Sequence, residues 1–280
     1  MRLTVSTYSF EAINLEGTLA ISKAMGFKGV DIGGFHNRGK ASLEPDEVGA
    51  NPQKFADDLR RLLDKYQLEP FDYFVQFGSN PPERSLNDPN PAVREKNFKS
   101  MPGIAKFCKL VGFHGLTVLP GVDHVGYSLD QNMALAGEGL KRYTEICGEQ
   151  GIMLCFEPHM GSVSDTPELA LALVEMAPKA LIVLDCSHYL LQYIPMDRIY
   201  KMIPHTGHVH VRQARFGKLQ TRFADGTIDF VDLAKRLEAA GYKHNMSIEY
   251  VCADWFDLNQ LDTLNETVVT KAALDQYVKV

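Results

Sequence analysis

The sequence alternates short apolar runs with amphipathic stretches, and this alternation restricts the fold more than any other feature of the chain. Eight of the apolar runs have the length and composition of β-strands. They are Leu3–Tyr8, Gly29–Ile32, Phe71–Phe77, Gly115–Leu119, Met153–Glu157, Leu181–Asp185, His208–Val211 and Met246–Val251. Eight strand–helix units in 280 residues predict an α/β fold of the (β/α)8 TIM barrel type, with residues 1–280 forming a single domain.

Signals for helix ends support this division. Thr166 is a predicted N-cap with Pro167 in the first helical turn, and Asp229 precedes another helix in the same way. Three helices are predicted to stop at glycines, which take the left-handed conformation cheaply, at Gly26, Gly112 and Gly241. A doubly wound open sheet is the alternative, but no Gly-x-Gly-x-x-Gly follows a strand and no P-loop is present.

Bulk properties exclude several classes of partner. The net charge of −6 disfavours nucleic acid and anionic membranes, which attract clustered Lys and Arg. No apolar run approaches the roughly 20 residues of a membrane span, and the first residues lack the apolar core of a signal peptide. Five cysteines without a Cys-x-x-Cys spacing indicate free thiols, so we expect a cytoplasmic protein. Cys186 is interpreted as a packing residue, because neighbouring strand residues face opposite sides.

Polar residues gather where the last four predicted strands end, and the active site of such a barrel lies at that end. Carboxylates that converge in a closed mouth repel one another, and a divalent cation resolves the conflict. The predicted ligands are Glu157, Asp185, His210 and Glu249. With a neutral histidine, three carboxylates and a dication leave one net negative charge. Such an oxygen-rich set favours Mn²⁺, with Mg²⁺, Co²⁺ or Zn²⁺ as alternatives.

Each of these residues also has an ordinary structural interpretation. Glu157 can pair with Arg or Lys, Asp185 can cap the next turn, His208 and His210 can be core histidines, and Glu249 can be a solvated strand end. Their occurrence on four consecutive strands favours one shared metal site over four coincidences.

Several short motifs, in this order, resemble the xylose isomerase-like barrel superfamily of sugar isomerases, epimerases and endonuclease IV. The motifs are Phe156-Glu-Pro-His159, Leu184-Asp-Cys-Ser-His188, Gly207-His-Val-His-Val211, Gly226-Thr-Ile-Asp-Phe230 and Ile248-Glu-Tyr250. Resemblance to the ketose 3-epimerases implies that the four predicted ligands hold one metal and that the two glutamates act as acid and base. It also implies that His188 contacts a substrate oxygen and that Arg212 or Arg215 binds sugar. Relatives of this kind are often dimers or tetramers.

Differences between the motifs of this chain and those of the related families narrow the range of expected functions. Xylose isomerase uses two metals with E-P-K-P and D-x-D patterns, whereas this chain reads Glu157-Pro-His-Met and lacks a matching D-x-D. The three-metal cluster of endonuclease IV needs a strand-three histidine, and that strand here ends Phe77-Gly-Ser-Asn. The epimerases usually carry an acid after strand seven, where this chain has Arg212-Gln213.

The expected function is therefore a metal-dependent sugar isomerase or epimerase that works through an enediolate. Glu157 or Glu249 removes the proton, the other returns one, and His159 is either a third acid or base or a histidine bonded to a neighbouring loop. The alternative is a lyase or dehydratase that acts on a keto-sugar, keto-inositol or 3-keto-glycoside by β-elimination. A third possibility is a non-catalytic sugar-binding protein on the same fold. Such a protein is expected to lack one of the acidic ligands, but all of the acidic ligands are present.

Aromatic residues near the strand ends are candidates for walls against a sugar, although core packing is the alternative for most of them. They are Tyr8, Phe10, Phe35, Tyr73 and Trp255, and Tyr8 is taken as a candidate substrate contact. The loop Gly78–Asp88, rich in Pro and Asn, is interpreted as part of the active-site end rather than as a linker.

Overall fold

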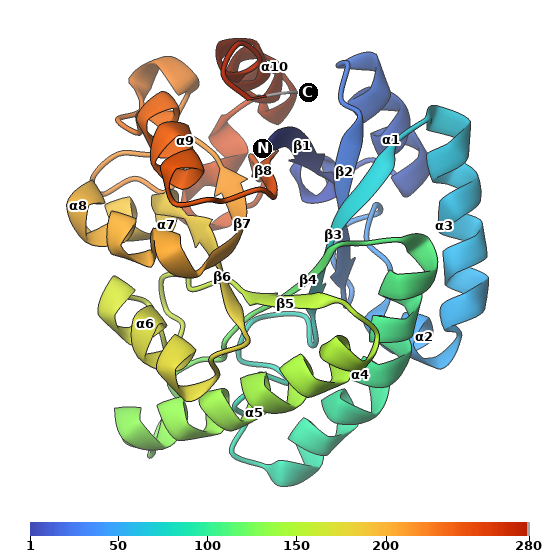
Figure 1. Cartoon of the computed structure of the whole chain (residues 1–280), viewed down its shortest axis with the longest axis vertical. Coiled ribbons are helices and arrows are strands. Elements are labelled where there is room, and N and C mark those ends of the chain that lie inside the picture. Colours follow the sequence, from blue (N-terminus) through green and yellow to red (C-terminus); the bar gives the residue numbers. More distant parts are fainter. Residues whose placement is uncertain (279–280) are drawn as a thin grey trace.

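Eight parallel strands close into a barrel in the order in which they occur along the chain, as the computed structural model of residues 1–278 shows (Figure 1). The strands are β1 (Arg2–Ser6), β2 (Gly29–Phe35), β3 (Glu69–Gln76), β4 (Gly115–Val118), β5 (Met153–Phe156), β6 (Leu181–Asp185), β7 (Thr206–Val211) and β8 (Asn245–Ile248). Each overlaps one of the eight predicted strands. The predicted (β/α)8 barrel is thus confirmed, and the doubly wound alternative is excluded.

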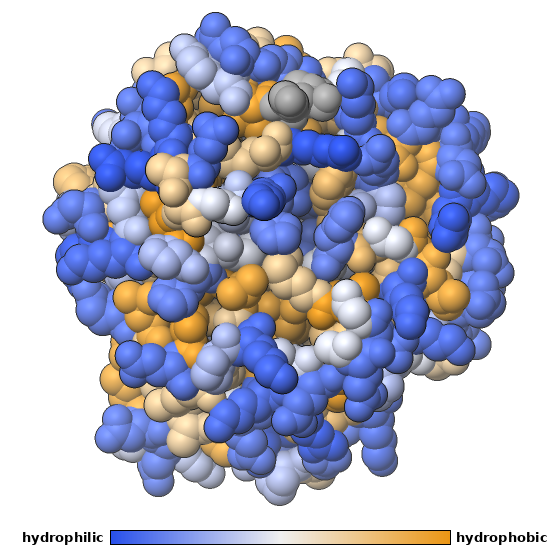
Figure 2. Space-filling model, viewed as in Figure 1, coloured by the Kyte–Doolittle hydropathy of each residue, from blue (hydrophilic) through white to orange (hydrophobic). Residues whose placement is uncertain are grey.

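Helices surround the barrel, and the hydrophobic core lies between them and the strands (Figure 1). The α-helices are α1 (Leu15–Ala24), α2 (Pro45–Ala50), α3 (Pro52–Tyr66), α4 (Pro91–Val111), α5 (Leu129–Glu149), α6 (Pro167–Met176), α7 (Cys186–Leu191), α8 (Met196–Ile199), α9 (Phe230–Ala239) and α10 (Thr263–Leu274). Four short 3₁₀ segments are η1 (Thr7–Phe10), η2 (Tyr200–His205), η3 (Phe223–Asp225) and η4 (Trp255–Gln260). Hydrophilic residues cover much of the face in Figure 2, with apolar residues between them.

The predicted helix ends are confirmed in detail. The Thr166 hydroxyl accepts from the Leu169 N–H at 3.3 Å, and the Asp229 carboxylate accepts from two backbone N–H groups at the start of α9. Satisfying these otherwise unpaired donors stabilises each helix start. The three predicted glycine stops have φ values of 83°, 97° and 81° at Gly26, Gly112 and Gly241.

Two strand ends differ from the prediction by three residues: β8 stops at Ile248 instead of Val251, and β2 extends beyond its predicted end at Ile32. The strand continues through Gly33 and Gly34 to Phe35, although glycine usually weakens a strand. A Cβ atom built on Gly34 would lie 2.3 Å from the Tyr73 hydroxyl oxygen. The glycine therefore permits a close approach between β2 and the aromatic side chain of β3.

Two other expectations can be checked directly. Within residues 1–278, no helix is both long and apolar enough to cross a membrane. All five cysteines are unpaired in the part of the chain that the structure describes, and Cys186 is buried in the hydrophobic core as predicted.

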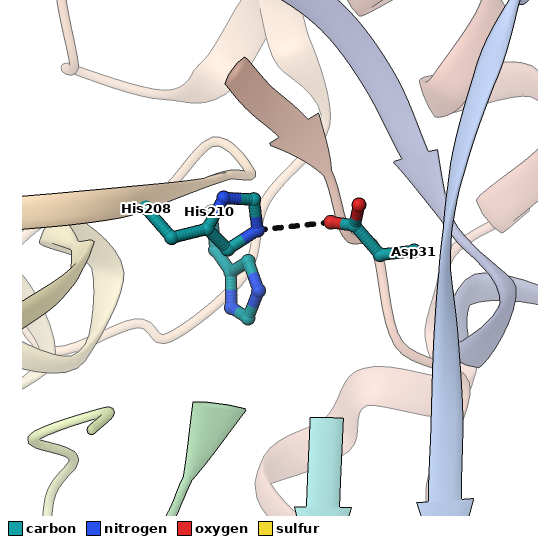
Figure 3. Close-up of side chains that lie close together, drawn as sticks. All are labelled: Asp31, His208 and His210. Carbon is teal, nitrogen blue, oxygen red and sulfur yellow. Dashed lines mark hydrogen bonds and ion pairs between the residues drawn. The ribbon is translucent and has the colours of Figure 1, made fainter. Parts of the chain in front are cut away.

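The centre of the barrel contains buried polar side chains beneath the strand ends. The His208 Nε2 atom on β7 lies 2.9 Å from the Asp31 Oδ2 atom on β2, as Figure 3 shows. Because β2 and β7 are not neighbours, this pair crosses the barrel interior. Asp72 on β3 is also buried, and neither of its carboxylate oxygens has a hydrogen-bond partner within residues 1–278. Burial and the nearby Asp31 carboxylate raise the pKa of Asp72 to about 6, although His208 opposes the shift.

We expect Asp72→Asn to stabilise the protein at pH 7.5 by up to about 3 kcal/mol and to have little effect at pH 4. The folded-state pKa of Asp72 lies above its ordinary value, so the unfolded chain loses this proton first. Stability from this group is therefore present below pH 4 and is lost as the pH rises to about 6. Urea unfolding of both proteins at the two pH values measures the difference.

Asp64→Asn, at an exposed position on α3, is the matched control and should leave the unfolding curve nearly unchanged at both pH values. An Asp72→Asn variant that is less stable than the parent protein at pH 7.5 would contradict the interpretation, because it would mean that the ionised carboxylate is favourably paired.

Candidate active site

Four polar side chains meet at the carboxyl ends of β5 to β8. Asp185 is the last residue of β6 and lies in register with His210 on β7. Glu157 and Glu249 follow β5 and β8 directly, and each still donates its backbone N–H to the preceding strand, at 3.0 Å. Four adjacent strands therefore fix the backbone of all four residues, which gives the side chains little freedom to separate.

The ligand atoms of these four side chains all lie within 4.8 Å of one another, and all four residues are buried. The His210 Nδ1 atom is 2.6 Å from Glu157 Oε1 and 3.2 Å from Glu249 Oε2. The other Glu249 oxygen is buried and has no hydrogen-bond partner among residues 1–278. An unpartnered buried carboxylate oxygen is costly, so the donor set fits a divalent cation with oxygen and imidazole ligands.

The Asp185 carboxylate has two structural partners as well. Its Oδ1 atom accepts from the Ser187 N–H at 2.8 Å and so caps α7, as one sequence interpretation expected. Its Oδ2 atom lies 2.7 Å from the Arg212 Nη2 atom. Burial acts to raise the pKa of Asp185, but the Arg212 charge and the capping bond from the Ser187 N–H outweigh it and lower the pKa to about 2. Asp185 is therefore ionised at neutral pH.

Arg212 corrects the charge balance expected from the sequence. The guanidinium is buried and also donates to the Ser187 hydroxyl at 2.8 Å. Three carboxylates, one guanidinium and a dication sum to zero, whereas the sequence-based balance left one negative charge. A neutral set is easier to bury than a charged one.

Glu157 and His210 form the other charged pair in the site. Burial raises the pKa of the Glu157 carboxyl, and the His210 imidazole opposes the rise. Burial acts to lower the pKa of His210, but the Glu249 and Glu157 carboxylates raise it well above its usual range. Without an ion, a proton on His210 thus compensates the carboxylates that face it.

Two further histidines, His159 and His188, lie beside the four candidate ligands and line the active-site cavity. Arg212 donates to the His188 Nε2 atom at 2.9 Å, and burial lowers the pKa of His188 well below its usual range, so this ring is neutral. His159 Nδ1 lies 2.8 Å from the Met160 carbonyl oxygen and must donate to it. Burial lowers the pKa of His159 and so favours the neutral ring, in which Nε2 is unprotonated; this atom has no partner among the described residues. The hydrogen bond at His159 is thus made to the next residue of its own loop and not to a neighbouring loop.

A cavity of about 780 Å³ lies beside the four candidate ligands, and of the groups described so far Glu157, His159, His188, Arg212 and Glu249 line it. Of the predicted aromatic walls, Tyr8, Phe35 and Trp255 line it, whereas Phe10 and Tyr73 are buried in the core. The predicted loop contributes Ser79 to Pro82. Of the two candidate sugar-binding arginines, Arg212 lines the cavity, whereas Arg215 is exposed and lies outside its lining.

A sequence model of the xylose isomerase-like TIM barrel family matches residues 19–274. The chain belongs to this family. A search of curated proteins finds no significant match to the chain.

Solved structures with the same fold include two proteins described as an epimerase or epimerase-like and one with a bound zinc atom. A D-tagatose 3-epimerase-like protein is 18% identical, with a TM-score of 0.76 over 99% of this chain and 98% of the other. A 3-keto-D-glucoside 4-epimerase from E. coli is 17% identical, with a TM-score of 0.72 over 96% and 99%. An IOLI protein with a bound zinc atom is 15% identical, with a TM-score of 0.74 over the whole of both chains.

The xylose isomerase-like barrel also brings residues to the cavity that the sequence analysis did not identify. Arg38 follows β2, Gln76 ends β3, and Met160 follows β5. The rule that identified the four candidate ligands, polar residues at strand ends, also applies to Arg38 and Gln76.

Proposed function

We propose that the protein is a metal-dependent sugar isomerase or epimerase that works through an enediolate of its substrate. The observation that carries the proposal is the convergence of Glu157, Asp185, His210 and Glu249, with ligand atoms within 4.8 Å. Structures of the same fold that are described as sugar epimerases add support. The oxygen-rich ligand set favours Mn²⁺ as the ion.

These four side chains would hold the proposed ion, which would supply Lewis-acid stabilisation of negative charge on a substrate carbonyl oxygen. Glu157 and Glu249 come from strands separated by β6 and β7, so their carboxylates reach the site from different sides of it. We assign them the proton transfers, in which one removes the proton next to the carbonyl and the other returns a proton to the opposite face.

The remaining polar groups are assigned to substrate binding and orientation. His188 is kept neutral chiefly by its burial and lines the cavity, where it contacts a substrate hydroxyl. Arg212 fixes the position of Asp185 through their 2.7 Å contact. The unprotonated His159 Nε2 atom accepts a hydrogen bond or a proton from a substrate hydroxyl.

β-Elimination is the second candidate, and the size of the cavity together with His159 favours it. A volume of about 780 Å³ lies in the upper part of the roughly 300–1,000 Å³ range of ligand pockets, so a glycoside fits as well as a single sugar. His159, once protonated, then serves as the acid for a leaving group. In this case the same first proton transfer is followed by loss of the β-substituent.

Incubation of the Mn²⁺-loaded protein in D₂O with a panel of neutral, acidic and phosphorylated ketoses and of 3-keto-glucosides separates the two candidates. We expect deuterium to enter the carbon next to the carbonyl with an intact carbon skeleton, as followed by NMR. A new alkene signal would instead support elimination. Absence of both exchange and elimination across the panel, with Mn²⁺ shown to be bound, would refute the proposed class of reaction.

A further inference from the structure

Arg38 occupies the loop after β2, and its guanidinium reaches the active-site cavity. The side chain is held in place by neutral groups. Its Nη1 atom donates to the Gln76 amide oxygen at 3.0 Å, and its Nη2 atom donates to the Tyr8 hydroxyl. The Cζ atom also lies 5.2 Å from the Tyr8 ring centroid and 5.7 Å from that of Phe35. Two aromatic rings and two hydrogen bonds therefore orient the cation before a ligand arrives.

The charge of Arg38 is not compensated by an ion pair within residues 1–278. Both of its hydrogen-bond acceptors are uncharged. The Glu11 carboxyl is near enough for the Arg38 charge to oppose the rise in pKa that burial causes, but the two side chains form no ion pair within residues 1–278. Asp123 also lines the cavity, but it is exposed to solvent. Arg212, by contrast, pairs with Asp185.

Arg38 and one candidate metal ligand, Glu249, both lie near Tyr8 in the cavity. Burial raises the pKa of the Tyr8 hydroxyl, and the charges of both Arg38 and Glu249 act on it. Tyr8 thus lies within electrostatic reach of the guanidinium and of one predicted acid or base. Because its oxygen accepts from Arg38, its own hydrogen is free to be donated to a ligand.

We propose that Arg38, with Tyr8, forms a subsite for an anionic group on the substrate, so that the preferred substrate is an acidic or phosphorylated sugar rather than a neutral one. This inference rests on the proposed function. Each terminal guanidinium nitrogen has a second N–H, and guanidinium groups bind carboxylate and phosphate oxygens strongly. The charges of the three carboxylates, Arg212 and a bound dication sum to zero, so Arg38 is the remaining positive charge that attracts the anion.

Binding of inert analogues tests the subsite without turnover. D-Glucitol, D-gluconate and D-glucitol 6-phosphate lack an aldehyde or ketone group, so they cannot enter the proposed enediolate reaction. Isothermal titration in a buffer with Mn²⁺ is expected to show at least one of the two anions binding about tenfold or more tightly than glucitol. Tighter gluconate indicates a sugar acid, and tighter glucitol 6-phosphate indicates a sugar phosphate. Arg38→Met should reduce the affinity of that anion to the level of glucitol.

Arg61→Met, which removes an exposed guanidinium on α3, is the matched control and should preserve the preference for the anion. The proposal is overturned if neither anion binds more tightly than glucitol, or if the preference survives in Arg38→Met, which would place the anion on the metal or elsewhere. A failure of both exchange and elimination across the D₂O panel would refute the proposed reaction and leave this binding result unaffected.

Discussion

Glu249→Gln is expected to lower turnover about a thousandfold on the sugar that the D₂O panel identifies. The substitution keeps the size of the side chain but removes its charge and its ability to accept a proton, and general acid–base catalysis contributes about 10²- to 10⁴-fold. Glu249 is 3% exposed and its Oε1 atom has no protein partner among the described residues. No solvated group is therefore placed to replace it. The measurement is kcat with saturating substrate and Mn²⁺.

Measurement of the Mn²⁺ bound by the variant distinguishes a loss of proton transfer from a weakened metal site. We expect the variant to bind Mn²⁺ at high concentration, so that the loss in kcat persists when the site is full. Glu238→Gln, at an exposed position on α9, should retain normal kcat. Full turnover by Glu249→Gln would show that the residue transfers no proton.

Arg212→Met is expected to destabilise the metal-free protein by about 3–5 kcal/mol, the typical cost of breaking a buried ion pair by removing one partner. The Arg212 Nη2 to Asp185 Oδ2 distance is 2.7 Å and both side chains are almost fully buried. The variant leaves three carboxylates without a guanidinium, so a dication should stabilise it more than it stabilises the parent protein. Urea unfolding in EDTA and in excess Mn²⁺ measures both effects.

The exposed pair Arg198–Glu168, with a similar distance of 2.6 Å, provides the control. Arg198→Met should cost at most about 1 kcal/mol, as is usual for solvated ion pairs, and should not alter the response to Mn²⁺. Equal stabilisation of the parent protein and Arg212→Met by Mn²⁺ would show that Arg212 plays no part in the charge balance of the site.

Local sequence signals were sufficient for most of the fold. Caps such as Thr166 and stops such as Gly112 act within one helical turn, so their effect can be predicted without knowledge of the tertiary structure. The strand ending at Asp185 was predicted to the residue. The extension of β2 through Gly34 was not, because it depends on the position of Tyr73 on the neighbouring strand.

Sequence patterns likewise predict some residues of the candidate site and not others. Glu157, His210 and their partners were brought together in the sequence analysis by one rule about strand ends, and the structure places their side chains within reach of one another. The pairing of Arg212 with Asp185 depends on the direction of a long side chain, and the position of Arg38 depends on a loop whose conformation is set by its packing against Tyr8. Neither can be deduced from spacing along the chain.

The distribution of these residues around the barrel has a consequence for engineering. The proposed reacting groups follow β5 to β8, whereas Tyr8, Arg38 and Gln76 follow or end β1 to β3, which lie in the blue and cyan part of Figure 1. The proposed proton-transfer groups and the proposed anion subsite are therefore encoded in separate halves of the polypeptide. Libraries restricted to the amino-terminal half would vary the anion subsite while keeping the proton-transfer groups intact.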